Sequence, residues 1–140
     1  MTEKKLIIDY IEYDSPMEMS EKDRELVEAA AEARKGSYSP YSRFQVGVAL
    51  LLENGAVVKG ANQENIAYPS GLCAERTAMF WASANYPGVP FDTIAISAAD
   101  RGVPVELPAS PCGDCRQVMA EYQRKFGKPI KVILAGEKRI

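Results

Sequence analysis

The sequence predicts an α/β fold, a three-layer α-β-α sandwich with a mixed sheet of about five strands. A β-hairpin pattern closed by Asn54-Gly55 is followed by alternating helix and strand patterns. A hairpin adds antiparallel strands to a sheet, and alternating units add further strands with helices on its faces. Apolar residues make up 46% of the 140 residues, which suits one domain with a buried core. We expect a single domain over residues 1–140, with residues 1–18 as an N-terminal extension.

The first half of the chain contains one helix and the hairpin. Residues 6–13 are rich in isoleucine and tyrosine and are expected to form an edge strand or an ordered extension. A helix is expected to begin at Ser20, where a hydroxyl precedes an acid by three residues, and to end at Gly36. The hairpin is expected to pair a strand at 44–52 with a return strand at 56–61.

The second half alternates between helices and strands. Gly127, with Pro129 just beyond it, is typical of the end of a helix. The expected elements are a polar loop at 62–72, a helix at 73–85, a strand at 92–99, a loop at 100–108, a helix at 112–126 and a strand at 130–134.

Charge and hydropathy exclude several classes of partner. The net charge is −2 and the pI is about 5.3, whereas a nucleic-acid binder usually carries a basic patch. The apolar runs are far shorter than the roughly 20 residues that span a bilayer. The N-terminus lacks the long apolar run and cleavage site of a signal peptide. We therefore expect a cytoplasmic protein that binds neither nucleic acid nor membrane.

Three cysteines indicate a metal site. Cys112 and Cys115 are three residues apart at an expected helix start, and Cys73 is expected to begin another helix. Reduced thiols in the cytoplasm serve as ligands or catalytic groups more often than as disulfide partners. Zinc favours thiolate ligands, and the chain has no histidine and no fourth cysteine. Unless a carboxylate fills it, the fourth position is open to water, as in a catalytic zinc site.

Two arginines adjoin these cysteines, and other interpretations of the cluster exist. One or both of Arg76 and Arg116 are expected to hydrogen-bond the sulfurs and so offset the charge that three thiolates place on zinc. A lone Cys-x-x-Cys pair is also typical of a thioredoxin-like redox site. Cys73 alone is compatible with an ordinary buried cysteine, and Glu75 with a solvated helix residue.

The motifs resemble a known signature. Cys73-Ala74-Glu75 and Pro111-Cys112-Gly113-Asp114-Cys115 fit the [HC]-x-E and P-C-x-x-C pattern of zinc-dependent nucleobase deaminases. The chain is most similar to the small homotetrameric cytidine deaminases that act on free nucleosides. Besides the two cysteine motifs, the resemblance rests on Ser39-Pro40-Tyr41-Ser42-x-Phe44-x-Val46-Gly47 and Asn62-Gln63-Glu64-Asn65.

The resemblance implies roles for the residues of the cysteine motifs. Cys73, Cys112 and Cys115 would be the zinc ligands, and zinc the cofactor. Glu75 would shuttle protons from the attacking water to ring nitrogen 3 of cytosine and then to the leaving amine. The main chain of Ala74 would hold the edge of the pyrimidine.

The resemblance also implies residues that bind the rest of the nucleoside. Phe44 would flank the pyrimidine ring, and Asn62 with Glu64 would bind the sugar hydroxyls. Tyr68 would approach the site of a neighbouring subunit in a homotetramer with shared sites. From the residue types alone, Phe44 is an ordinary core residue and Asn62 and Glu64 belong to a polar loop.

The predicted function is zinc-dependent hydrolysis of cytidine and deoxycytidine to uridine and deoxyuridine plus ammonia, in pyrimidine salvage. One alternative is a deaminase of a modified cytosine nucleoside such as blasticidin S. Another is a zinc-stabilised binding domain without catalysis. Family members usually continue with another strand and an aromatic residue that reaches an adjacent site. Because the sequence stops at Ile140, we expect that wall of the pocket to lie outside it or to be built differently.

Overall fold

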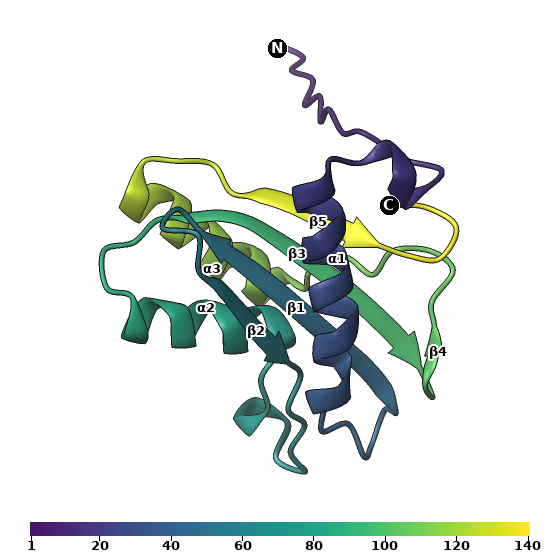
Figure 1. Ribbon diagram of the computed structural model, residues 1–140. Helices are drawn as coiled ribbons and strands as arrows, with labels where there is room; N and C mark the ends of the chain where they lie inside the picture. Colours follow the sequence, from purple (N-terminus) through teal and green to yellow (C-terminus); the bar gives the residue numbers. More distant parts are fainter.

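The computed structural model describes residues 1–140, and a five-stranded sheet lies at its centre (Figure 1). The strand order is β2-β1-β3-β4, and β5 pairs with β3 as well. Only the β3–β5 pair is parallel, so the sheet is mixed, which confirms the predicted fold class. The strands are β1 (Phe44–Leu52), β2 (Val57–Ala61), β3 (Phe91–Asp100), β4 (Val103–Pro104) and β5 (Lys131–Ala135).

Helices cover both faces of this sheet and complete the three layers. Helix α1 lies on one face, and α2 and α3 lie on the other, as Figure 1 shows. The helices are α1 (Glu21–Ala33), α2 (Ala74–Asn85) and α3 (Gly113–Phe126), with short 3-10 turns η1 (Pro16–Glu18), η2 (Arg34–Gly36) and η3 (Tyr68–Ser70).

Strand β1 is apolar on both faces because it contributes to two cores. Val48, Leu50 and Leu52 point toward α2 and α3 and belong to the larger cluster. Ala49 and Leu51 point the other way, toward α1, and belong to the smaller one. The side-chain period of two along a strand explains why neighbours enter different cores.

Two glycines let helices approach the sheet closely. A β-carbon on Gly47 would lie 2.3 Å from the carbonyl oxygen of Ala30 in α1. A β-carbon on Gly60 would lie 2.6 Å from the carbonyl oxygen of Ala74, the first residue of α2. Only glycine fits such contacts without a shift of backbone. Gly60 therefore fixes the start of α2 against β2.

The predicted boundaries of the helices and of the hairpin are confirmed to within about one residue, except at the end of the first helix, where α1 stops at Ala33 and the last predicted turn, up to Gly36, is the 3-10 turn η2. The Ser20 hydroxyl accepts a hydrogen bond from the amide of Asp23, which caps α1. Gly55 has a φ of +86° in the hairpin turn, and Gly127 ends α3 in the left-handed conformation with a φ of +64°.

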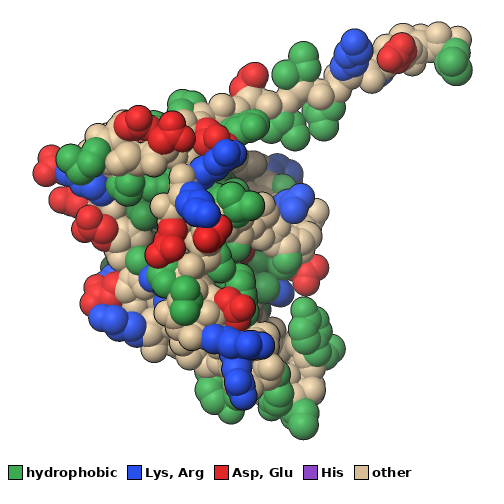
Figure 2. Space-filling view, turned by 90° about the vertical axis from the view of Figure 1, so that its right-hand side faces the viewer, with side chains coloured by type: hydrophobic (Ala, Val, Ile, Leu, Met, Phe, Trp, Pro, Cys, Tyr) green, Lys and Arg blue, Asp and Glu red, His purple; other side chains and the backbone are tan.

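Of the two alternatives predicted for residues 6–13, an edge strand or an ordered extension, the edge strand is wrong. Residues 1–12, here called the N-terminal arm, have no regular secondary structure and leave the body of the molecule (Figures 1 and 2). No strand lies beside the arm, and backbone pairing begins only at Tyr13, which exchanges two hydrogen bonds with Ile140 at 2.9 and 3.1 Å. Its large apolar side chains are exposed: Leu6, Ile7, Ile8, Tyr10 and Ile11.

The loop predicted at residues 100–108 contains the short strand β4. Its two residues pair antiparallel with Ala99 and Asp100 at the end of β3. A positive φ at Arg101 and Gly102 makes the tight connection between the two strands. No helix of the structure has the length and apolar character needed to cross a membrane.

Candidate metal centre and substrate pocket

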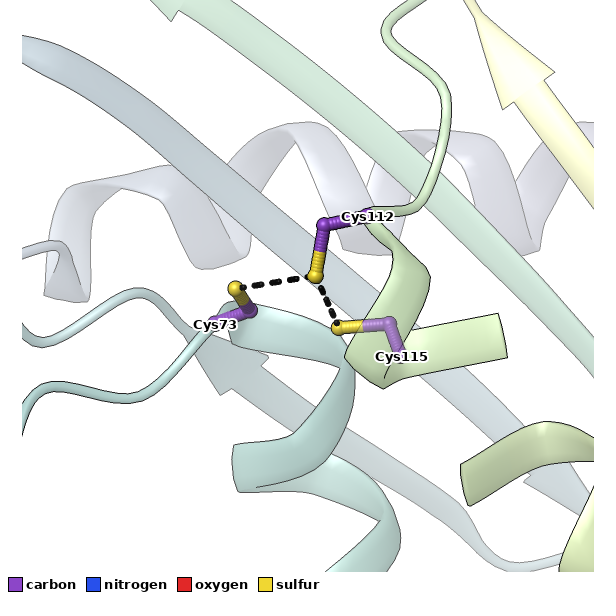
Figure 3. Close-up of side chains that lie close together, drawn as sticks. All are labelled: Cys73, Cys112 and Cys115. Carbon is purple, nitrogen blue, oxygen red and sulfur yellow. Dashed lines mark hydrogen bonds between the residues drawn. The ribbon is translucent and has the colours of Figure 1, made fainter. Parts of the chain in front are cut away.

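Three sulfur atoms meet at the N-termini of two helices. Cys73 is the N-cap residue of α2 and Cys112 that of α3, while Cys115 lies in the first turn of α3 (Figure 3). The Cys112 sulfur lies 3.8 Å from that of Cys73 and 3.5 Å from that of Cys115, and all three lie within 4.8 Å of one another. Tetrahedral zinc with bonds of about 2.3 Å would place its sulfurs about 3.8 Å apart. The cluster therefore fits a zinc ion with three thiolate ligands.

The three cysteines differ in burial, which gives the cluster an open side. Cys115 is fully buried, Cys73 is half-buried and Cys112 is exposed. Cys73 and Cys112 line a cavity of about 640 Å³, whereas Cys115 does not. A fourth ligand could reach a metal held by this cluster from the cavity.

The thiols ionise unequally in the absence of a metal. The hydrogen bond from Cys115, helped by those from Arg76 and Cys112, lowers the pKa of Cys73 to about 5 against the effect of burial. The same hydrogen bond to Cys73, together with burial, raises the pKa of Cys115. The cluster thus holds a thiolate near neutral pH, and metal binding would displace the remaining thiol protons.

The two arginines beside the cysteines have different partners. An Nη of Arg76 lies 3.4 Å from the Cys73 sulfur and 3.8 Å from a carboxylate oxygen of Asp114. The Nε of Arg76 is a buried donor without a partner. The Nε of Arg116 instead donates to the carbonyl oxygen of Pro111 at 2.8 Å. Arg76 is therefore the arginine whose charge acts directly on a sulfur.

Glu75 lies in the first turn of α2 and is only 5% exposed. Burial is the main reason that the pKa of this carboxyl is raised, and the charge of Cys73 adds to the effect. A carboxyl with a raised pKa gains and loses a proton more readily near neutral pH, which suits a proton carrier.

The cavity beside the cysteines joins several of the residues singled out in the sequence. Its wall also includes Asn62, Glu64 and Tyr68, which follow β2 in the chain. Arg76 and the start of α3 at residues 112–114 also line it. Phe44, Ala74, Glu75 and Arg116 are not in its wall.

Asn62 fastens the loop after β2 to the start of β1. Its Oδ1 accepts hydrogen bonds from the Ser37 hydroxyl at 2.6 Å and from the Val46 amide at 2.8 Å. Its Nδ2 donates to the carbonyl oxygen of Phe44 at 2.9 Å. An amide group has two donor hydrogens and two acceptor sites, so one N–H of Asn62 is left for a ligand.

Glu64 is held by a residue to which the sequence motifs assign no role. The hydroxyl and the amide of Ser42 both donate to its carboxylate, at 2.5 and 3.2 Å. The sequence signal was the Ser39-Pro40-Tyr41-Ser42 stretch, but only the fold shows that this loop reaches Glu64.

Comparison with known proteins gives the same family throughout. Residues 20–127 match the family model of the cytidine and deoxycytidylate deaminase zinc-binding region. A cytidine deaminase of Halalkalibacterium halodurans is 50% identical over 96 residues, covering 69% of this chain and 68% of that protein. One of Mycobacterium tuberculosis is 40% identical over 93 residues, covering 66% of this chain and 65% of that protein.

Solved structures show the same fold. The crystal structure of a cytidine deaminase from Burkholderia pseudomallei superposes with a TM-score of 0.67 at 43% identity, covering 84% of this chain and 85% of that one. That from Mycobacterium tuberculosis gives 0.65 at 31% identity, covering 85% and 92%. The cysteine cluster lies inside the matched zinc-binding region, so zinc is the cofactor that it fits. The chain belongs to the cytidine and deoxycytidylate deaminase family.

Proposed function

We propose that the protein catalyses the hydrolytic deamination of cytidine and deoxycytidine to uridine and deoxyuridine plus ammonia, in pyrimidine salvage. One observation carries the proposal: two cysteines of the three-cysteine cluster line the same cavity as Asn62 and Glu64. A cavity of about 640 Å³ is within the range that suits a small molecule. The relatives named above are cytidine deaminases.

The chemistry divides between the metal and a buried carboxyl. Activation of the attacking water is the chemistry that bound zinc supplies. Cys73, Cys112 and Cys115 hold the metal, and Arg76 offsets their negative charge through its contact with the Cys73 sulfur. Glu75 takes a proton from the attacking water and delivers it to ring nitrogen 3. It later moves the proton of the hydroxyl added at carbon 4 to the leaving amine, so that the carbonyl of the product forms and ammonia departs. Its burial and raised pKa support this role.

The nucleoside is held at both of its ends. Asn62 donates its free N–H, and Glu64 accepts through its carboxylate, so together they bind the sugar hydroxyls. The family resemblance assigns Phe44 to flank the pyrimidine and the main chain of Ala74 to hold its edge. Neither residue lines the cavity, but each adjoins a residue that does, because the Phe44 carbonyl accepts from Asn62 and Ala74 follows Cys73. A carboxylate at the sugar repels a phosphate there, which favours free nucleosides over nucleotides and strands.

The assembly in this proposal is a cytoplasmic homotetramer of single catalytic domains that share their sites. Tyr68 and Ile66 lie in the cavity wall and are 91% and 86% exposed, so a neighbouring subunit could cover them. Phe80 and Trp81 of α2 are also large exposed apolar residues. Residues 1–18 form an extension ahead of the matched region, which begins at residue 20.

The test measures zinc content and nucleoside turnover in one preparation. Purified protein is assayed for zinc and incubated with cytidine and deoxycytidine, and the change in ultraviolet absorbance is followed. We expect about one zinc per chain and turnover of both nucleosides. The Glu75→Gln variant keeps the size of the side chain, so it should retain zinc but lose turnover by at least about 100-fold.

One control variant and two contrary outcomes complete the test. Glu121 is an exposed glutamate of α3 that pairs with Arg124, so Glu121→Gln should leave turnover unchanged. Zinc-loaded protein without turnover of any cytosine nucleoside would refute the proposed deaminase activity. Wild-type turnover by Glu75→Gln would refute the role of Glu75 alone.

A further inference from the structure

The carboxylate of Glu64 is held by three hydrogen bonds from one loop. The Tyr41 amide donates to Oε2 at 2.9 Å, and the Ser42 amide donates to the same oxygen at 3.2 Å. The Ser42 hydroxyl donates to Oε1 at 2.5 Å. Ser42, Tyr41 and Glu64 all line the cavity beside the metal centre.

The number of acceptor sites on a carboxylate limits what Glu64 can still bind. Two carboxylate oxygens offer about four lone-pair sites. The two amides fill Oε2, and the Ser42 hydroxyl takes one site on Oε1. One acceptor site on Oε1 is therefore left. The Ser42 hydroxyl has only one hydrogen, which it donates to Glu64, so it has none to donate to a ligand.

Ser42 is itself fixed in place. Its Oγ accepts a hydrogen bond from the amide of Phe44 at 2.9 Å, so the hydroxyl bridges Glu64 and the first residue of β1. Arg43, between Ser42 and Phe44, has a φ of +59°, which turns the chain so that this bridge can form. The backbone of Glu64 is also held, because its amide donates to the carbonyl of Tyr38 at 2.7 Å.

We propose that Ser42 is a positioning residue that orients the Glu64 carboxylate and leaves one acceptor site on Oε1 for the 3′-hydroxyl of the nucleoside. This inference rests on the proposed function. Only cytidine carries a 2′-hydroxyl, so a contact that serves both proposed substrates does not depend on that group. Both substrates carry 3′- and 5′-hydroxyls, and the comparison with a 3′-deoxynucleoside tests the 3′-hydroxyl directly. The hydrogen bond from Ser42 also holds the pKa of Glu64 below its usual range, which keeps the carboxylate an acceptor.

The test compares substrates with and without that hydroxyl. Ser42→Ala should raise the KM for cytidine about tenfold, because a hydrogen bond to a charged group is lost, and should change kcat less than about twofold. With 3′-deoxycytidine, wild type and Ser42→Ala should have the same KM. Ser42→Thr keeps the hydroxyl and should restore the KM for cytidine.

Binding measurements separate this inference from the proposed function. The same variants are titrated by calorimetry with uridine and 3′-deoxyuridine, because binding needs no turnover. The matched control is Ser70→Ala. Ser70 lies in the loop after β2 that also carries Glu64, and its neighbours Pro69 and Gly71 line the cavity whereas Ser70 itself does not. Circular dichroism and zinc content confirm that each variant is folded.

The outcomes are distinct. Wild-type protein that turns over no cytosine nucleoside refutes the proposed function, while the calorimetric ratios still test Ser42. The same rise in KM or Kd with and without the 3′-hydroxyl overturns the role of Ser42. The role is also overturned if Ser42→Thr behaves like Ser42→Ala, or if kcat falls at constant KM.

Discussion

Gly60 of β2 lies against the carbonyl oxygen of Ala74, so closely that a β-carbon at position 60 would be 2.6 Å from that oxygen. Ala74 directly follows Cys73 and precedes Glu75. The contact between strand and helix therefore sets where a metal ligand and the proposed proton carrier stand.

Replacing Gly60 with alanine should displace the start of α2. We expect Gly60→Ala to lower the free energy of unfolding by about 1–3 kcal/mol and to weaken zinc binding. Thermal unfolding and zinc titration measure the two effects. Gly36→Ala is the control, because its β-carbon would lie 3.6 Å from that of Ala61, an ordinary contact. Equal zinc affinities for Gly60→Ala and Gly36→Ala would contradict the prediction.

The two arginines beside the cysteines should differ in importance. Arg76→Gln removes the charge 3.4 Å from the Cys73 sulfur and should lower kcat about tenfold in zinc-loaded protein. Arg116→Gln should change kcat less than about twofold, because the Arg116 Nε bonds a main-chain oxygen. Steady-state kinetics on both variants at matched zinc content gives the comparison. The prediction fails if the two substitutions have the same effect.

Asp23 should make the free energy of unfolding depend on pH in the acid range. Burial opposes ionisation of Asp23, but hydrogen bonds from Lys131 at 2.6 Å and from Ser20 at 2.7 Å outweigh it and hold its pKa below the usual range. A lowered pKa in the folded state contributes stability that is complete above the unfolded value of about 4 and is lost as the pH falls through the folded value. The free energy of unfolding of Asp23→Asn should therefore fall less than that of wild type below about pH 4.

Urea unfolding from pH 7 down to pH 3 checks this sign. The control is Glu32→Gln, because Glu32 is an exposed partner of Lys59 and should contribute little. A loss of stability at low pH as steep in Asp23→Asn as in wild type would argue against Asp23 as a source.

Removal of zinc should loosen the link between α2 and α3. Cys73 comes from one helix start, and Cys112 and Cys115 come from the other, so a bound ion joins two separate segments. We expect chelation to lower Tm by several degrees and added zinc to restore it. Cys112→Ser should show a smaller shift on chelation because one of three thiolates is missing. A Tm that chelation leaves unchanged in wild type would exclude this stabilising role.

Local patterns predicted most of the fold. The Asn54-Gly55 turn and the apolar residues of β1 identified the hairpin, and Gly127 identified the end of α3. Cys112 and Cys115 are three residues apart at a helix start, which is a local signal, whereas Cys73 is 39 positions from Cys112 and was joined to them by the motif resemblance. The turn, strand and helix signals are local and need no knowledge of distant partners.

The features that were missed depend on distant partners. A strand at residues 6–13 would need a neighbouring strand to pair with, and the composition of the segment does not show whether one is present. Strand β4 exists because two residues reach the end of β3. Ser42 belongs to a sequence motif that assigns it no role. Its hydrogen bond to Glu64, which is 22 positions away, is visible only in the fold. The direction of the Arg116 side chain, toward Pro111, is likewise a property of the fold.

Strand β2 connects the two ends of the proposed site. Asn62 and Glu64 follow its last residue, and Gly60 within it supports the helix that begins after Cys73. The spacing between the proposed sugar-binding residues and the cysteine cluster therefore depends on a single short strand at the edge of the sheet. A substitution that disorders β2, or a ligand that pairs with its free edge, would therefore lower the activity without altering any residue proposed to contact the substrate.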